Sequence, residues 1–171
     1  MRIYLDTEFI EYPYTIDLIS IGLVDGFGNT AYFESSEFDE SKANEFVRER
    51  VLPSLGLREE DRLPLPVIRD RILEFVGESC QGGVPEFWGY YADYDWVVFC
   101  WLFGAMIDLP DGWPMYCRDL RQELDRLGAM VPEDVVPKPG SHNALDDAQW
   151  AKAAHEWLLQ WESNGGGCRA I

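Results

Sequence analysis

Two acidic side chains near the start of the chain, Asp6 and Glu8, stand two residues apart at the end of the apolar run IYLDTEF. On a β-strand, residues two positions apart point to the same face, so both carboxylates can reach one spot. Converging carboxylates repel each other unless protons or cations neutralise them. The chemistry that best suits this pair is the binding of a hard divalent cation such as Mg²⁺ or Mn²⁺.

A third candidate ligand, Asp95, lies in the run YYADYDW, where Asp93 is the alternative. Asp93 stands where a helix N-cap belongs, a position that aspartate favours. Asp95 shares a helical face with Phe99 and Leu102, and that face has to be buried. An inward carboxylate needs a partner, which either a metal ion or a helix N-terminus would supply. We favour the metal role for Asp95.

The run SHNALDDA offers a choice between Asp146 and Asp147. Ser141 or Asn143 can cap the final helix, and with Asn143 as the cap Asp146 is the third helical residue, a position that favours acids. A stripe of small residues shares a helical face with Asp147: Ala144, Ala151 and Ala154. Such a stripe lets a helix press close to a sheet. We therefore predict that Asp147 reaches the strand that carries Asp6 and Glu8.

His142 is one of only two histidines in the sequence, and it follows a loop rich in proline and glycine, five residues before Asp147. Imidazole titrates near neutral pH, so this ring can take a proton from water at working pH. The other histidine, His155, falls inside an amphipathic helix. We assign His155 no function.

The elements that must position these residues follow from their patterns. Five segments have the composition of strands: 2–6, 16–24, 30–35, 84–91 and 113–117. Five segments have helical periodicity: 41–55, 65–77, 93–106, 118–128 and 143–161. Pro53 is expected to stop the first of these helices, and glycines to end the next three at Gly77, Gly104 and Gly128.

Three antiparallel strands followed by βα units indicate an α/β protein. We expect a mixed sheet of three antiparallel strands plus two parallel ones, with helices on both faces, in the order of the ribonuclease H-like architecture. The sequence of 171 residues contains no internal repeat and no linker. It predicts one domain at 1–162 and a flexible C-terminal tail at 163–171.

The composition limits the possible functions. A net charge of −17 argues against a protein that grips long nucleic acid, although it allows one that holds only the last nucleotides. No run of about 18 uncharged apolar residues predicts a membrane helix, and the first residues do not read as a signal peptide. The four cysteines form no CxxC pair, which indicates reduced thiols in a cytoplasmic protein.

Taken together, the motifs resemble those of the DEDDh group of 3′–5′ exonucleases. They are D-x-E at 6–8, the pair Tyr94-Asp95, and H-x-x-x-x-D at 142–147. Within that group, three runs are similar to the RNase AS type, which trims adenylate-rich RNA: DTEFIE at 6–11, LISIG at 18–22 and RDLRQEL at 118–124. The resemblance extends from Arg2 to about Trp157.

The resemblance implies a metal-dependent 3′–5′ exoribonuclease that hydrolyses single-stranded RNA from its 3′ end to nucleoside 5′-monophosphates, and a homodimer. Two divalent ions, Mg²⁺ or Mn²⁺, would be held by the four carboxylates of Asp6, Glu8, Asp95 and Asp147. These ions stabilise the entering and leaving oxygens of an in-line displacement. His142 would deprotonate the attacking water.

The same resemblance places the backbone of Thr7, Phe9 and Ile10 beside the terminal nucleotide. Phe9 either stacks on a base or packs in the core. Glu11 could accept a hydrogen bond from the exocyclic amine of adenine. We expect the tryptophans to serve packing, among them Trp96, Trp101 and Trp157.

Two other functions compete with this one. The first is a DNA or short-oligonucleotide 3′–5′ exonuclease of the same group. The second is a non-enzymatic acidic interaction protein or DNA mimic, for which the net charge is the support. Acidic mimicry needs surface charge, however, whereas these carboxylates are expected to point inward.

Overall fold

A computed structural model describes residues 1–166 of the chain, and a five-stranded mixed sheet lies at its centre. The strands are β1 (Arg2–Tyr12), β2 (Thr15–Asp25), β3 (Thr30–Glu34), β4 (Glu86–Gly89) and β5 (Arg118–Asp119), in the spatial order β3-β2-β1-β4-β5. The first three are antiparallel neighbours, and β4 and β5 continue the sheet in parallel. The predicted α/β class and mixed sheet are confirmed.

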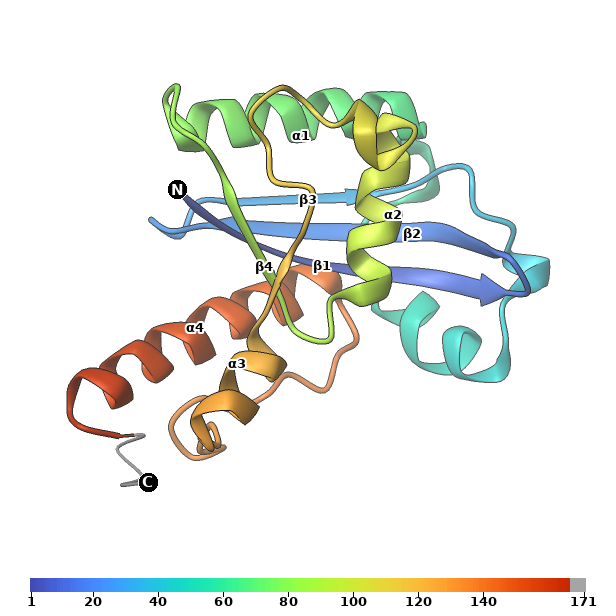
Figure 1. Cartoon of the computed structure of the whole chain (residues 1–171). Helices are drawn as coiled ribbons and strands as arrows, with labels where there is room; N and C mark the ends of the chain where they lie inside the picture. The colour runs from blue at the N-terminus through green and yellow to red at the C-terminus, as the bar shows by residue number, and fades with distance from the viewer. Residues whose placement is uncertain (167–171) are drawn as a thin grey trace.

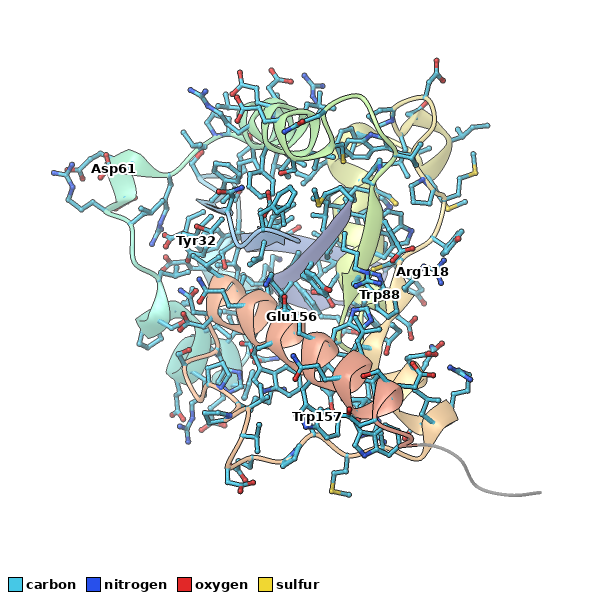
Figure 2. The ribbon with its side chains drawn as sticks, turned by 90° about the vertical axis from the view of Figure 1, so that its left-hand side faces the viewer. Tyr32, Asp61, Trp88, Arg118, Glu156 and Trp157 are labelled. Atoms are coloured by element: carbon cyan, nitrogen blue, oxygen red, sulfur yellow. The ribbon has the colours of Figure 1, made fainter. Side chains whose placement is uncertain are left out.

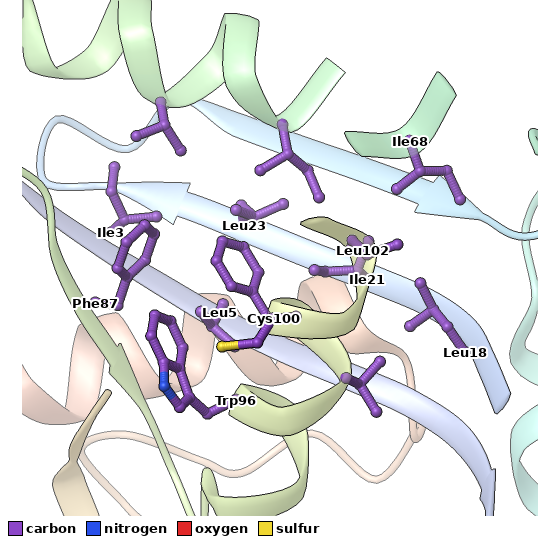
Figure 3. Packing of buried hydrophobic residues seen from close by; sticks show 14 of the residues in the cluster. Ile3, Leu5, Leu18, Ile21, Leu23, Ile68, Phe87, Trp96, Cys100 and Leu102 are labelled. Carbon is purple, nitrogen blue, oxygen red and sulfur yellow. The ribbon is translucent and has the colours of Figure 1, made fainter. Parts of the chain in front are cut away.

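Helices cover both faces of this sheet (Figure 1). They are α1 (Leu65–Cys80), α2 (Asp93–Phe103), α3 (Leu120–Leu127) and α4 (Ala144–Ser163). The core between the sheet, α1 and α2 includes Ile3, Leu5 and Phe87 (Figure 3). A second core, around Tyr4 and Trp88, lies under α4 (Figure 2). None of the helices within residues 1–166 is long and apolar enough to cross a membrane.

The long strand β1 has very unequal neighbours. Strand β2 pairs with it from Ile3 to Tyr12, but β4 pairs only with Arg2 to Tyr4. The chain leaves β4 at Gly89, where an added Cβ would lie 2.6 Å from the Cβ of Ala92, so glycine permits a tight turn into α2. Beyond this turn, the edge of β1 carrying the D-x-E motif is open for side chains from the helices.

Helix α4 lies close against the sheet because small residues face it. A Cβ on Gly22 of β2 would stand 2.4 Å from the carbonyl oxygen of Ala144. The stripe on this face is fully buried: Ala144, Ala148, Ala151 and Ala154. The predicted small-residue stripe is thus confirmed, and it brings the start of α4 over the strands.

Several predicted boundaries were wrong. β1 continues to Tyr12 rather than ending at residue 6, because β2 pairs with it throughout. The predicted strand at 113–117 is irregular, and the pairing with β4 begins only at Arg118. Helix α1 passes Gly77 and ends at Cys80, where Gln81 adopts the left-handed conformation with φ 49°. The N–H of Gln81 donates to the carbonyl of Gly77, which is why this glycine lies within the helix.

The segment predicted as a helix at 41–55 is divided into short turns. It contains 3₁₀ turns at Glu40–Lys42 and Leu52–Ser54 and a π-helical turn at Val47–Val51. The π turn buries both of its valines against Ile10 and Ile19 of the sheet. This tertiary packing overrides the regular helical pattern of the sequence. Further 3₁₀ turns occur at Glu59–Asp61 and Met106–Asp108.

The C-terminal tail and Trp101 also differ from the prediction. Ser163 still belongs to α4, residues 164–166 form a turn, and 167–171 lie outside the described residues. Trp96 packs in the core as expected. Trp101, by contrast, is 49% exposed, so its assignment to the core was wrong.

Candidate active site

One pocket of about 240 Å³ opens where β1 extends past β4. Its lining includes the whole predicted catalytic set, Asp6, Glu8, Asp95, His142 and Asp147. These residues come from β1, from the first turn of α2, from the loop before α4 and from the first turns of α4. The fold therefore brings together residues that are remote in sequence, as the motifs predicted.

Three of the carboxylates form a compact group. Oxygens of Asp6, Glu8 and Asp147 all lie within 4.8 Å of one another. Asp6 and Glu8 share the sheet face of Tyr4, which packs in the core under α4, and Asp147 approaches from that helix. Among the residues that the structure describes, none donates a hydrogen bond to these three carboxylates. The group thus offers several unengaged oxygens to a ligand from outside.

The proximity of these acids shifts their titration. Burial raises the pKa of Asp6 well above its usual range, and the charges of Asp95, Asp147 and Glu8 raise it further. Burial and the neighbouring charge of Asp147 raise the pKa of Glu8 to about 8. Burial also raises the pKa of Asp147, against the opposing effect of Lys138 and His142. The site is short of positive charge.

This donor set fits hard divalent cations. Carboxylate oxygens are the ligands that Mg²⁺ and Mn²⁺ prefer, and a cation removes the repulsion that raises the pKa values. Asp6, Glu8 and Asp147 meet the geometric requirement, since their oxygens converge and lack other partners.

Asp95 reaches the pocket from the opposite face of the sheet. Its Oδ1 accepts hydrogen bonds from the backbone N–H of Thr7, at 2.8 Å, and from the Thr7 hydroxyl, at 2.6 Å. Burial raises the pKa of Asp95 to about 6, although the Thr7 bonds oppose the shift. One oxygen therefore joins α2 to the open edge of β1. Its Oδ2 accepts no hydrogen bond from another described residue.

Asp93 does not have the role that the sequence suggested. The N-cap of α2 is Ala92, and Asp93 is the first helical residue. The backbone N–H of Ala92 donates to Asp119 Oδ2, at 2.7 Å, while Asp119 Oδ1 accepts from the N–H of Gln122 and caps α3. One carboxylate of β5 thus fixes the starts of two helices, and the sequence analysis missed it.

The predicted start of α4 is confirmed. The side chain of Asn143 is the N-cap and accepts from the N–H of Leu145, at 3.0 Å. Asp146 is then the third helical residue, and it accepts from the Ser141 hydroxyl rather than entering the pocket. Asp147 is the acid of this helix that lines the pocket.

The backbone around His142 has an unusual conformation. His142 has φ 46°, in the left-handed region that non-glycine residues seldom adopt. Its carbonyl accepts a 2.6 Å hydrogen bond from the Ser54 hydroxyl, and its ring packs edge-on against Phe46, with centroids 5.0 Å apart. Contacts from the 46–54 segment therefore hold the histidine at the pocket.

The four expected substrate contacts differ in their positions. Thr7 and Phe9 line the pocket, and the ring of Phe9 stacks on Tyr94 with centroids 5.8 Å apart. The side chain of Ile10 is 1% exposed and packs in a core cluster, so this residue can offer only its backbone. Glu11 is exposed and does not line the pocket.

Lys138 lines the pocket, although the sequence did not predict it there. It lies in the loop before α4, and its Nζ is 4.9 Å from the ring centroid of Tyr90 and 5.2 Å from that of Trp150. It is the cation whose charge lowers the pKa of Asp6. A possible signal was its position between two prolines, Pro137 and Pro139, which stiffen the approach to the motif.

His155 has a structural environment. Its Nδ1 lies 3.1 Å from the Tyr4 hydroxyl, and its ring packs on Trp88, with centroids 3.9 Å apart. Burial lowers its pKa to about 4, so the ring is neutral in the core. This is consistent with assigning it no catalytic role.

The chain is similar to known proteins both in its fold and in its sequence. A solved structure of the Neurospora crassa Pan2 catalytic unit, with protease and nuclease domains, superposes with a TM-score of 0.62 at 16% identity. The match covers 96% of this chain but 28% of the Pan2 chain, and it shows a shared fold. Two Mycobacterium tuberculosis proteins, the 3′-5′ exoribonucleases Rv2179c (strain H37Rv) and MT2234.1 (strain CDC 1551), are each 37% identical over 158 residues.

Each of these alignments covers 87% of this chain and 88% of the mycobacterial protein. A family model described as the 3′-5′ exoribonuclease Rv2179c-like domain matches residues 1–159, which contain every residue of the acidic pocket. The resemblance drawn from the motifs is therefore confirmed. This chain belongs to the Rv2179c-like family of 3′–5′ exoribonucleases.

Proposed function

We propose that this protein is a metal-dependent 3′–5′ exoribonuclease that removes nucleotides from the 3′ end of single-stranded RNA and releases nucleoside 5′-monophosphates. The observation that carries the proposal is the convergence of Asp6, Glu8 and Asp147, unpaired by any donor of the described residues, in a chain of this family. A purely acidic interaction protein has no need for such a pocket, so we set that alternative aside.

Four carboxylates would hold two divalent cations, Mg²⁺ or Mn²⁺. Asp6, Glu8 and Asp147 form the compact group, and Asp95 would add a carboxylate oxygen from the other side of β1. When bound, such a pair of ions stabilises the entering and leaving oxygens of an in-line displacement at phosphorus. Thr7 has a supporting role, because its two hydrogen bonds fix the orientation of Asp95.

His142 would act as the general base. His142 lines the pocket, and a ring nitrogen of its imidazole would accept the proton of the attacking water. The Ser54 and Phe46 contacts limit the motion of the histidine before the water arrives.

Stacked aromatic rings would position the terminal nucleotide. Phe9 lines the pocket and lies nearly parallel to Tyr94, with an interplanar angle of 12°. Base stacking is tolerant of sequence, so a preference for adenylates needs polar contacts as well. We retain Glu11 as a candidate for such a contact. Because it lies on β1 outside the pocket, it could contact a base only if the RNA runs along this strand. From the family resemblance and the cysteine pattern, we also predict a homodimer and a cytoplasmic location.

A product ladder tests the activity directly. The protein is incubated with 5′-labelled oligoadenylate and either Mg²⁺ or Mn²⁺, and the products are separated at single-nucleotide resolution. We expect a ladder that shortens from the 3′ end and the accumulation of AMP. An unchanged oligonucleotide in both metals, with active nuclease as a positive control, would refute the proposal.

A matched oligodeoxyadenylate separates RNA from DNA as the substrate. Only the RNA offers a 2′-hydroxyl, which a protein can use to distinguish the two. We expect faster hydrolysis of the RNA. Faster hydrolysis of the DNA would favour the alternative function, a DNA or short-oligonucleotide exonuclease with the same catalytic groups.

A further inference from the structure

A second cavity, of about 260 Å³, lies on the α2 side of the sheet. Its floor is apolar and includes Leu18 of β2 and Leu102 of α2, which both belong to the core on this side of the sheet (Figure 3). Trp101 forms part of the wall and is 49% exposed. A half-exposed indole beside an apolar cavity is suited to a flat ligand, such as a nucleobase.

Neighbouring residues of β1, β2 and α2 link this cavity to the active-site pocket. Phe9 lines the pocket, and its partner across the β1–β2 ladder, Leu18, lines the cavity. On α2, Tyr94 stacks on Phe9, and Val98 and Trp101 follow one and two turns later on the same side. Tyr94 and Trp101, each about half exposed, therefore mark an aromatic path from the catalytic pocket to the cavity.

The length of this path suits an RNA strand. Tyr94 and Trp101 are seven residues apart on one helix, which corresponds to about 10 Å at 1.5 Å per residue. That distance equals roughly three stacked nucleotides at about 3.4 Å each. A strand whose 3′ end lies among the carboxylates can thus reach the cavity with a base two or three positions upstream.

Two acidic residues form the rim of the cavity, and their negative charge favours entry of a base over entry of a phosphate. Asp17 and Glu37 line it. Each uses one oxygen inside the protein, Asp17 for the Tyr12 hydroxyl and Glu37 for the N–H of Leu65. Their other oxygens repel phosphate but can accept from an exocyclic amine, as carboxylates do with cytosine. The phosphates must therefore stay outside, toward solvent.

We infer that this cavity is an upstream base-binding site of the proposed exoribonuclease, which takes an amine-bearing nucleobase two or three positions before the 3′ end and stacks it on Trp101. The inference rests on the proposed function. It explains why a large aromatic side chain stays exposed in a highly acidic protein. It also adds base contacts that do not depend on attraction of the phosphates.

The test compares substrates of two lengths. The dinucleotide ApA occupies only the catalytic pocket, whereas hexaadenylate reaches the cavity. We expect Trp101→Ala to lower kcat/KM for hexaadenylate about tenfold, a typical effect of losing one stacked base, and to leave kcat/KM for ApA unchanged. Trp101→Phe should retain most of the hexaadenylate rate, because it keeps an aromatic ring.

Phe27→Ala is the matched control, since Phe27 is an exposed aromatic at the opposite end of β2, 76% exposed. It should change neither rate. Equal rates of wild type and Trp101→Ala on hexaadenylate would overturn the inference, and so would equal losses on both substrates. If the wild type hydrolyses neither substrate, the proposed function itself fails.

The role of Asp17 at the rim is tested with two hexanucleotides of different base. Asp17→Asn keeps the shape but replaces the acceptor charge, and hexauridylate lacks the exocyclic amine. We expect the variant to lose part of the preference for hexaadenylate over hexauridylate, with ApA unaffected. An unchanged ratio of the two hexamer rates would contradict the role of the rim.

Discussion

The molecule contains two groups of carboxylates that are fully or partly buried, and the groups differ in their hydrogen bonds. Asp25 and Glu34 are both 0% exposed. Asp25 accepts from the N–H groups of Phe27 and Asn29 and from the Ser79 hydroxyl. Glu34 accepts from the Tyr32 hydroxyl, from two backbone N–H groups at 56–57 and from the Arg62 guanidinium. In the pocket, Asp6 and Glu8 have other carboxylates as neighbours instead of donors.

The titration of the two groups differs accordingly. Burial alone would raise the pKa of Asp25, but the hydrogen bonds from Asn29, Ser79 and Phe27 outweigh it and lower the pKa. Burial and like charges raise the pKa of Glu8 to about 8. A buried acid with donors stabilises the fold, whereas a partly buried acid that lacks donors and lies beside like charges destabilises it until a cation binds. The absence of donors is thus the better indicator of a functional site than burial.

The largest expected effect is on activity, through Asp6→Asn. This variant keeps the shape of the side chain but removes the charge that would bind metal, so we expect kcat to fall by about 10²–10³-fold or more. In EDTA the variant should melt at or above the wild-type temperature, because a repelling charge is gone. A lower melting temperature together with lost activity would mean that Asp6 is structural, like Asp25.

His142→Ala should reduce kcat by about 10²–10⁴-fold while leaving metal binding intact. Titration calorimetry with Mn²⁺ measures the binding, and single-turnover hydrolysis of oligoadenylate measures the chemistry. His155→Gln is the matched control, since it alters the other histidine outside the pocket. A full rate for His142→Ala at neutral pH would remove it as the general base.

Opposite effects on stability should distinguish the two kinds of acid. Glu34→Gln weakens the acceptor of several donors and should lower the free energy of unfolding by about 1–3 kcal/mol. Glu8→Gln should raise it in EDTA at pH 7 and above, because the neutral amide avoids the cost of protonating this carboxyl, or of leaving it charged, beside like charges. Urea unfolding monitored by tryptophan fluorescence measures both. An equal loss of unfolding free energy in both variants would show that the pocket acids stabilise the fold in the same way as the structural acids.

The sequence predicts the positions of the three converging carboxylates better than the contacts that hold Asp95 and His142. A D-x-E pair on a strand has to share a face, and the alanine stripe places Asp147 on the inward face of α4. The double hydrogen bond from Thr7 to Asp95 depends on where β4 stops, and no local pattern encodes that. The same holds for the contact of Ser54 with His142, since it joins segments that are far apart in the chain.

The fold also has features that local sequence predicts and features that depend on tertiary packing. Strand identity and the mixed sheet follow from alternation and turn residues, whereas the π-helical turn at Val47–Val51 follows from packing under the sheet. The pairing of Arg118 and Asp119 with β4, in place of the more apolar run before them, also depends on tertiary contacts. Local sequence thus determines which residues face inward, and tertiary contacts determine where an element stops.

The raised pKa of Glu8 predicts how the metal-free stability changes with pH. In the unfolded chain this carboxyl titrates near 4.5, and in the fold near 8, so folding takes up a proton between these values. The contribution of Glu8 to stability is therefore present at low pH and is lost as pH rises from about 4.5 to 8. Melting temperatures in EDTA should fall over this range by a few degrees, and less so in Glu8→Gln.

Mn²⁺ should reverse that fall, because a cation favours the ionised acids that high pH produces. Asp25→Asn provides the comparison, since the pKa of Asp25 is lowered and its contribution is lost at acid pH instead. A metal-free melting temperature that rises from pH 5 to pH 8 would show that the pocket acids are ionised and satisfied in some other way.

The smallest expected effect concerns Lys138, the cation of the acidic pocket. We expect Lys138→Met to weaken binding of oligoadenylate about three- to tenfold, with a larger effect on KM than on kcat, because one attractive charge for phosphate is lost. The slope of log affinity against log salt should become smaller by about one. Lys138→Arg should keep the slope, since it keeps the charge. If Lys138→Met leaves both KM and the salt slope unchanged, the lysine only neutralises the carboxylates and does not contact RNA.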